Sequence, residues 1–169
     1  MRIQARITLP ASMRGTIDAA RVLWNPEIAS NNPAHVTVVY HDEAPDLGVL
    51  RSRLANVCRR LSAFTLYLST VERFERPDSG AFIRVVDAHS RVQQIRDVVL
   101  APPFTPRARF GLHVTLLHPA QGSRLSEAWP SLCLLERIGA FAVDRIDIVT
   151  GAALETETLV SLPLQARPN

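Results

Sequence analysis

Two histidines and two threonines occur with the same spacing at two places in the chain. His35 and Thr37 lie in the segment AHVTVV, and His113 and Thr115 lie in LHVTLL, 78 residues later. The aliphatic and β-branched neighbours of both motifs are typical of short buried strands. Side chains alternate between the faces of a strand, so the histidine and threonine of each motif should share one face, roughly 7 Å apart at Cα.

These groups suit the chemistry of a phosphate ester. Hydrolysis of a phosphate ester needs a base that takes a proton from water and an acid that protonates the departing oxygen. Histidine can serve in either role near neutral pH, and hydroxyl donors can stabilise the charge that develops on the phosphoryl oxygens. One His-x-Thr occurs by chance in roughly one chain in five of this length. Two copies on equivalent apolar strands instead favour a shared catalytic site.

Four residues near the motifs are possible substrate contacts. Arg107 and Arg109 precede the second motif in a proline-rich loop, where they could bind phosphate or simply be solvated. Tyr40 and Phe110 could stack on a base, although packing in the core is the commoner role for such rings.

The other histidines do not complete a metal site. His41 shares a face with His35 but lies about 20 Å along an ideal strand, too far for one metal ion. His118 follows His113 on the opposite face and is interpreted as a structural or surface residue, and His89 opens a predicted helix. We therefore predict no metal and no other cofactor.

The elements that must position the motifs occur in the order strand, helix, strand, helix, strand, and this order occurs twice. Alternating or continuous apolar runs predict the strands. Apolar residues at helical spacing predict the helices, with Ser12 and Asp46 as N-caps of the first two. The predicted strands are 2–9, 35–40, 64–74, 81–87, 113–118, 141–151 and 159–164, and the predicted helices are about 13–24, 47–62, a helix from Ser90 and a helix from Leu125 to Ile138.

A shift of 78 residues superimposes these elements, so that 2–79 repeats as 80–157 and the strand 159–164 closes the chain. The period is longer than that of the common solenoid repeats, and it fits two similar lobes that share one domain over residues 1–169. In such an arrangement the two His-Thr strands would lie on either side of a central cleft.

Composition agrees with one ordinary domain. The chain has 169 residues, 47% of them apolar, which is enough for a proper core. Its net charge is +3 and all 19 basic residues are arginine. Arginine is suited to phosphate, but a bias in genomic composition explains the same preference, and most of these side chains should be solvated. No membrane span or signal segment is evident, so we expect a soluble, cytoplasmic protein. Cys58 and Cys133 fall on apolar helix faces and are predicted to be buried, reduced thiols.

At its two motifs the chain resembles the two-histidine phosphoesterase superfamily, which includes the 2′–5′ RNA ligase-like cyclic phosphodiesterases. The signature of that family is a pair of His-x-Thr/Ser motifs, each followed by a hydrophobic residue, here Val38 and Leu116. The similarity in element order extends over nearly the whole chain. It implies an α+β, duplicated bilobal fold, with two antiparallel-rich sheets and outer helices around a central cleft.

The resemblance also implies metal-independent chemistry on a 2′,3′-cyclic phosphate or a 2′–5′ phosphodiester. His35 and His113 would be the acid–base pair, and Thr37 and Thr115 would bind the phosphate. The substrates would be RNA ends or small cyclic nucleotides, with no role for DNA or a membrane. Two other functions stay open: a nucleotide- or RNA-binding module without turnover, and a phosphoesterase of a non-nucleotide metabolite. The direction of the reaction, the identity of the base and the oligomeric state do not follow from the sequence.

Overall fold

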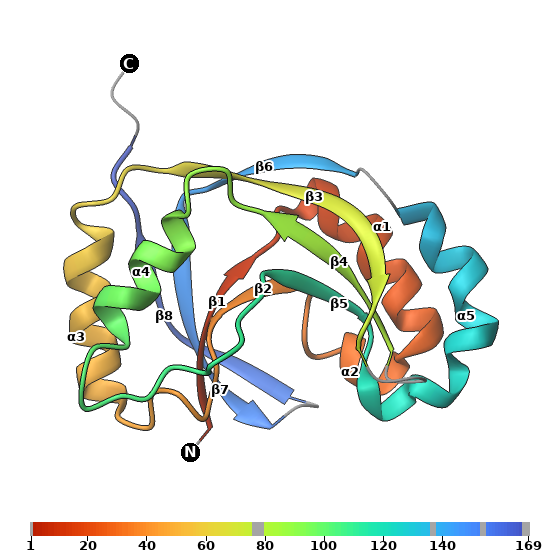
Figure 1. Ribbon diagram of the computed structural model, residues 1–169, viewed down its shortest axis with the longest axis horizontal. Coiled ribbons are helices and arrows are strands. Elements are labelled where there is room, and N and C mark those ends of the chain that lie inside the picture. Colours follow the sequence, from red (N-terminus) through yellow and green to blue (C-terminus); the bar gives the residue numbers. More distant parts are fainter. Residues whose placement is uncertain (1, 76–79, 136–137, 153–154, 167–169) are drawn as a thin grey trace.

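The computed structural model describes residues 2–75, 80–135, 138–152 and 155–166 (Figure 1). Within those ranges the chain forms eight strands, and the helices pack on the outer sides of the sheets that these strands form. The strands are β1 (Ile3–Thr8), β2 (His35–Val39), β3 (Phe64–Arg73), β4 (Ala81–Val86), β5 (His113–Leu117), β6 (Gly139–Val143), β7 (Arg145–Ala152) and β8 (Glu155–Pro163). The α-helices are α1 (Ala11–Trp24), α2 (Pro26–Ala29), α3 (Leu47–Cys58), α4 (Arg91–Val99) and α5 (Leu125–Leu132), with 3-10 turns at Pro119–Arg124 and Cys133–Leu135.

The strands form two four-stranded antiparallel sheets. Sheet 1 has the order β2-β1-β7-β8 and sheet 2 the order β5-β4-β3-β6. Helices α3 and α4 pack on sheet 1 and helices α1 and α5 on sheet 2, so the sheets lie between two groups of helices (Figure 1). The predicted α+β class with two antiparallel-rich sheets is therefore confirmed.

Each sheet combines strands from both halves of the predicted repeat. Strand β3 leaves the first half to pair with β4, and β7 leaves the second half to pair with β1. Strands β2, β1 and β7 thus occupy the same places in sheet 1 as β5, β4 and β3 in sheet 2. This correspondence agrees with a repeat of the elements, although the boundary between 2–79 and 80–157 does not separate one sheet from the other. The duplication itself stays a prediction.

The predicted strand 141–151 is wrong in one respect, because the chain breaks it at Asp144. Residues before Asp144 form β6 in sheet 2, and residues after it form β7 in sheet 1. The Asp144 carbonyl accepts a hydrogen bond from the Leu164 N–H just beyond β8, which ties this crossing to the closing strand. The alternating residues continue across the break, so periodicity alone predicts one strand.

The helix boundaries also differ from prediction. The first helix begins after Pro10, whose carbonyl accepts the N–H groups of Met13 and Arg14, so Ser12 lies inside the first turn and is not the N-cap. Asp46 does cap α3, accepting the Val49 N–H at 2.9 Å. Helices α3 and α5 end at Cys58 and Leu132, earlier than predicted, and the second is followed by a 3-10 turn.

The core explains the apolar neighbours of the motifs. Val36, Val38, Val114 and Leu116 are completely buried, on the face of their strands opposite the histidines and threonines. Cys58 is a buried thiol, and burial raises its pKa to about 11. In the parts of the chain described above, no helix is both long and apolar enough to cross a membrane.

Candidate active site

The two motif strands lie next to each other where the sheets meet. Each occupies one end of its sheet, and β2 and β5 are neighbours in space (Figure 1). In sheet 1, His35 lies opposite Thr8 of β1, whereas in sheet 2, His113 lies opposite Arg84 of β4. Strand alternation places the polar face of both motifs toward the space between the sheets.

That space contains a cavity of about 430 Å³. The residues of both motifs line it together, as the sequence predicts: His35, Thr37, His113 and Thr115. Six further lining residues matter for its chemistry: Gln4, Arg21, Tyr40, His41, Arg107 and His118. The volume falls in the range of small-ligand sites.

The two motif histidines are held in the same way. Nδ1 of His35 is 2.8 Å from the Pro33 carbonyl, and Nδ1 of His113 is 2.9 Å from the Gly111 carbonyl. A carbonyl oxygen only accepts hydrogen bonds, so each Nδ1 must carry the proton and donate it. In the neutral imidazole, Nε2 then keeps its lone pair and is available to a ligand.

The surroundings of His35 are cationic. Its pKa is lowered to about 3, first by burial and then by the positive charges of Arg6, Arg21 and His113, while the hydrogen bond to Pro33 acts in the opposite direction. Arg6 and Arg21 are both about 4% exposed. His35 is therefore neutral near pH 7.

The surroundings of His113 are aromatic instead. The rings of Phe74 and Phe82 contact its imidazole edge-to-face, with centroids 5.6 and 5.4 Å away. Burial lowers the pKa of His113, and the hydrogen bond to the Gly111 carbonyl opposes that change. The two motifs thus present equivalent histidines in chemically unequal environments.

Thr37 has a partner that the sequence analysis did not single out. Gln4 donates a hydrogen bond from Nε2 to the Thr37 hydroxyl oxygen at 2.8 Å. Because the oxygen accepts from Gln4, the hydroxyl proton is free to point toward a ligand in the cavity. The alternation of side chains along β1 places Gln4 on the same face as Arg6. This alternation is the sequence pattern that could have identified Gln4 as a residue of the site.

The proposed substrate contacts separate into two groups. Tyr40 and Arg107 line the cavity, with the Arg107 guanidinium 3.8 Å from the centroid of the Tyr40 ring and hydrogen-bonded to both carboxylate oxygens of Asp42. Arg109 is outside the cavity lining and forms an exposed ion pair with Glu75 at 3.2 Å.

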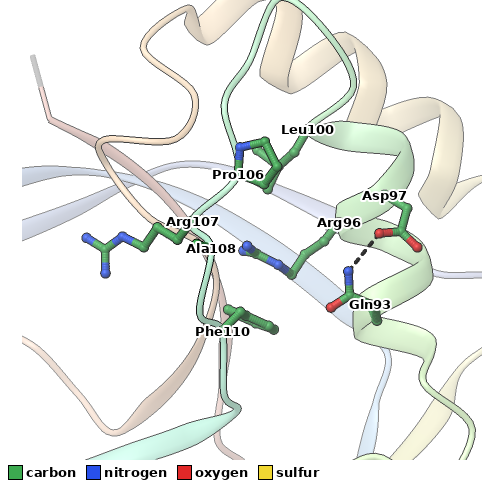
Figure 2. Close-up of a pocket in the computed structure, with 8 residues that line it drawn as sticks. All are labelled: Gln93, Arg96, Asp97, Leu100, Pro106, Arg107, Ala108 and Phe110. Carbon is green, nitrogen blue, oxygen red and sulfur yellow. Dashed lines mark hydrogen bonds between the residues drawn. The ribbon is translucent and has the colours of Figure 1, made fainter.

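Phe110 is also outside the cavity lining and packs against a buried cation. Its ring centroid lies 3.6 Å from the Arg96 guanidinium. Figure 2 shows this contact between α4 and the loop before β5, with the Arg107 side chain pointing away from the helix. Phe110 therefore anchors the loop, in agreement with the packing alternative.

The buried pair of Arg96 and Glu43 connects the first motif strand, β2, to this loop. Two guanidinium nitrogens of Arg96 donate to the Glu43 carboxylate at 2.9 and 2.6 Å, and one also donates to the Val38 carbonyl at 2.6 Å. Glu43 accepts further hydrogen bonds from the N–H groups of Tyr40 and Arg107. We call this set the Glu43 network.

His41 and His118 also line the cavity, although the sequence analysis predicts only a structural or surface position for His118 and proposes no substrate contact for either residue. Strand β2 ends at Val39 and β5 at Leu117, and beyond those points strand alternation no longer decides where a side chain lies. Nδ1 of His118 accepts the Ala120 N–H at 3.1 Å, so the proton of this ring is on Nε2. Among the residues whose positions are described, no group of three or more histidine, cysteine or acidic side chains is arranged to hold a metal.

Comparisons with known proteins identify the family of the chain and structures with a similar fold. The model of the 2'-5' RNA ligase superfamily matches residues 9–153. The Escherichia coli LigT structure complexed with 3'-AMP superposes with a TM-score of 0.63 at 18% identity, covering 96% of this chain and 97% of that one. TT0787 of Thermus thermophilus superposes with a TM-score of 0.64 at 15% identity, over 99% and 100% of the two chains. No curated protein matches the sequence.

Proposed function

The chain belongs to the 2'-5' RNA ligase superfamily, and we propose that it opens 2′,3′-cyclic phosphates on RNA ends or small nucleotides without a metal ion. One observation supports this most strongly. The two His-x-Thr motifs come from different sheets, yet all four side chains line the same cavity. Two acid–base groups and two hydroxyl donors around one cavity are sufficient for in-line hydrolysis.

The reaction exchanges one P–O bond for another. A water oxygen attacks phosphorus as the base removes its proton, and the bond between phosphorus and one ribose oxygen breaks. The acid gives a proton to that ribose oxygen, so the products are a phosphomonoester and a free hydroxyl. Thr37 and Thr115 donate to the non-bridging oxygens, where negative charge increases, and Gln4 orients the Thr37 hydroxyl.

The unequal surroundings of the histidines assign their roles in this proposal. His35, with a pKa lowered to about 3, is neutral and accepts the proton of water at Nε2. His113, away from the two arginines, is the acid that protonates the leaving oxygen from Nε2. After turnover His35 holds the proton and His113 has lost one, and exchange with solvent restores both.

Turnover should not depend on added metal. We expect 2′,3′-cyclic mononucleotides and RNA ending in a cyclic phosphate to be hydrolysed equally well in excess EDTA, because the proposed groups need no Lewis acid. The assay should include 2′–5′ linked dinucleotides and a non-nucleotide phosphodiester. Loss of activity in EDTA with recovery in a divalent ion would contradict the mechanism, and binding without turnover of any substrate would favour a binding module.

The pH dependence of kcat/KM should reflect the two lowered pKa values of the free enzyme. His35 must be neutral, so the acid side of the kcat/KM profile should fall only near pH 3, the pKa of His35. His113 must be protonated, and since its pKa lies below 6.5, kcat/KM should fall about tenfold between pH 7 and pH 8. A bound phosphate raises both pKa values, so the kcat profile should be displaced to higher pH. A kcat/KM that rises over that interval, with chemistry rate-limiting, would contradict these roles.

Thr37→Ala should lower kcat by on the order of 10²-fold, the usual effect of losing one donor to a transition-state oxygen. Thr37→Ser keeps the hydroxyl and serves as the matched control, so we expect it to retain most of the activity. The measurement is steady-state hydrolysis of a cyclic mononucleotide. Equal activity of the alanine and serine variants would show that this hydroxyl does not stabilise the transition state.

A further inference from the structure

A groove of about 960 Å³ continues from the cavity past His113. It shares Tyr40, Phe74, His113 and Pro119 with the cavity. From there it extends along the paired strands β3 and β4 and the loop that precedes β5. We call this surface the β4 groove. A phosphate held between the motif histidines would lie at its inner end.

Aromatic rings line the inner part of the β4 groove. Phe74 and Phe82 lie 4.7 Å apart between centroids, and Phe82 also contacts the His113 ring. Both phenylalanines are only half-buried. Nucleic acid bases of any identity stack on such rings, because every base has an aromatic face.

Two exposed arginines also line the groove. The Arg84 side chain is 58% exposed and is paired with Glu72, and Arg109 is 88% exposed and is paired with Glu75. Exposed ion pairs contribute little stability, since water and salt screen them. Either guanidinium can therefore exchange its carboxylate for a phosphate at small cost, and its planar shape suits that partner.

We propose that the β4 groove binds the nucleotide preceding the reacting end of an RNA strand, so that the protein prefers oligonucleotide ends to cyclic mononucleotides. This inference rests on the proposed function, which places the cyclic phosphate between His35 and His113. A 2′,3′-cyclic phosphate terminates its strand, and the rest of the RNA continues from the 5′ oxygen of the same nucleoside. The strand therefore needs an open path away from the cavity. The aromatic rings provide stacking along that path, and the arginines provide phosphate contacts.

Equilibrium binding of a mononucleotide 3′-phosphate and of a single-stranded RNA trinucleotide 3′-phosphate tests the groove without requiring turnover. We expect the trinucleotide to bind at least about tenfold more tightly, as one added stacking contact predicts. The double variant Arg84→Gln/Arg109→Gln should lose most of that difference while its mononucleotide affinity stays within about twofold. Arg145→Gln is the matched control. Arg145, in sheet 1, also forms an exposed ion pair, and it donates two hydrogen bonds to the Asp144 carboxylate.

The outcomes separate this inference from the proposed function. Equal affinity for the two ligands, binding of neither, or an equal loss in the Arg145→Gln control would overturn the groove as an RNA site. If binding depends on length and on the groove arginines but no cyclic phosphate is hydrolysed, the groove is supported and the proposed reaction fails. The same comparison of kcat/KM for cyclic-phosphate substrates should show the same preference for the longer RNA.

Discussion

Replacing either motif histidine by alanine is expected to lower kcat for cyclic phosphate hydrolysis by about three powers of ten or more. His35→Ala removes the base that takes the proton of water, and His113→Ala removes the acid that protonates the leaving oxygen. Each role is worth several orders of magnitude when the group is correctly positioned. Because both act in one displacement, the double variant should be little slower than either single variant.

A substrate with a good leaving group distinguishes the two roles. In a p-nitrophenyl phosphodiester the leaving group, p-nitrophenolate, departs without being protonated. His113→Ala should therefore retain most of its activity on this substrate, whereas His35→Ala should stay inactive. The reverse result would exchange the assignments of base and acid. His89→Ala is a suitable control, because His89 lies outside the cavity lining and should leave both reactions unchanged. Full activity of either motif variant on the cyclic substrate would refute acid–base catalysis by this pair.

Much of this site follows from local pattern. A strand period of two predicts that His35 and Thr37 share a face and that Val36 and Val38 lie in the core, and the structure has this arrangement. The same argument applies to the second motif. Repetition of the motif predicts that both strands meet, because one histidine and one threonine could not provide an acid, a base and two donors.

The remaining parts of the site depend on contacts between distant residues. The chain passes from sheet 2 to sheet 1 at Asp144, and local periodicity does not indicate which sheet a strand joins. His41 and His118 line the cavity only because each strand ends one or two residues before them. The unequal charge around the motif histidines comes from buried arginines such as Arg21 on α1, whose burial follows from tertiary packing.

The Glu43 network is the clearest case of a feature without a sequence signal, and it supports a large prediction. Glu43 is 1% exposed and Arg96 is 2% exposed, and they are 53 residues apart in the chain. Glu43→Gln leaves the buried guanidinium without a compensating charge, so we expect the free energy of unfolding to fall by about 3–5 kcal/mol. Urea unfolding measures this loss. Asp144→Asn, which breaks an exposed pair with Arg145, should cost about 1 kcal/mol or less.

A double variant tests whether the loss comes from the unpaired charge. Glu43→Gln/Arg96→Met removes both members of the pair, so it should be less destabilised than the sum of its two single variants. Additive losses would mean that the two side chains contribute separately, through hydrogen bonds to the loop and to Val38 and not through their pairing.

The pH dependence of unfolding gives an independent measure of the same pair. Burial by itself raises the pKa of Glu43, but hydrogen bonds from Arg96 and from the backbone of Arg107 and Tyr40 outweigh it and hold the pKa below its usual value. A carboxyl group whose pKa is lowered by folding stabilises the protein above its unfolded pKa, and this stabilisation is lost as the pH falls through the folded pKa. The difference in unfolding free energy between wild type and Glu43→Gln should therefore have its largest value near pH 7 and should become smaller below about pH 4. A difference that stays constant down to pH 3 would show that Glu43 does not stabilise the fold as a carboxylate.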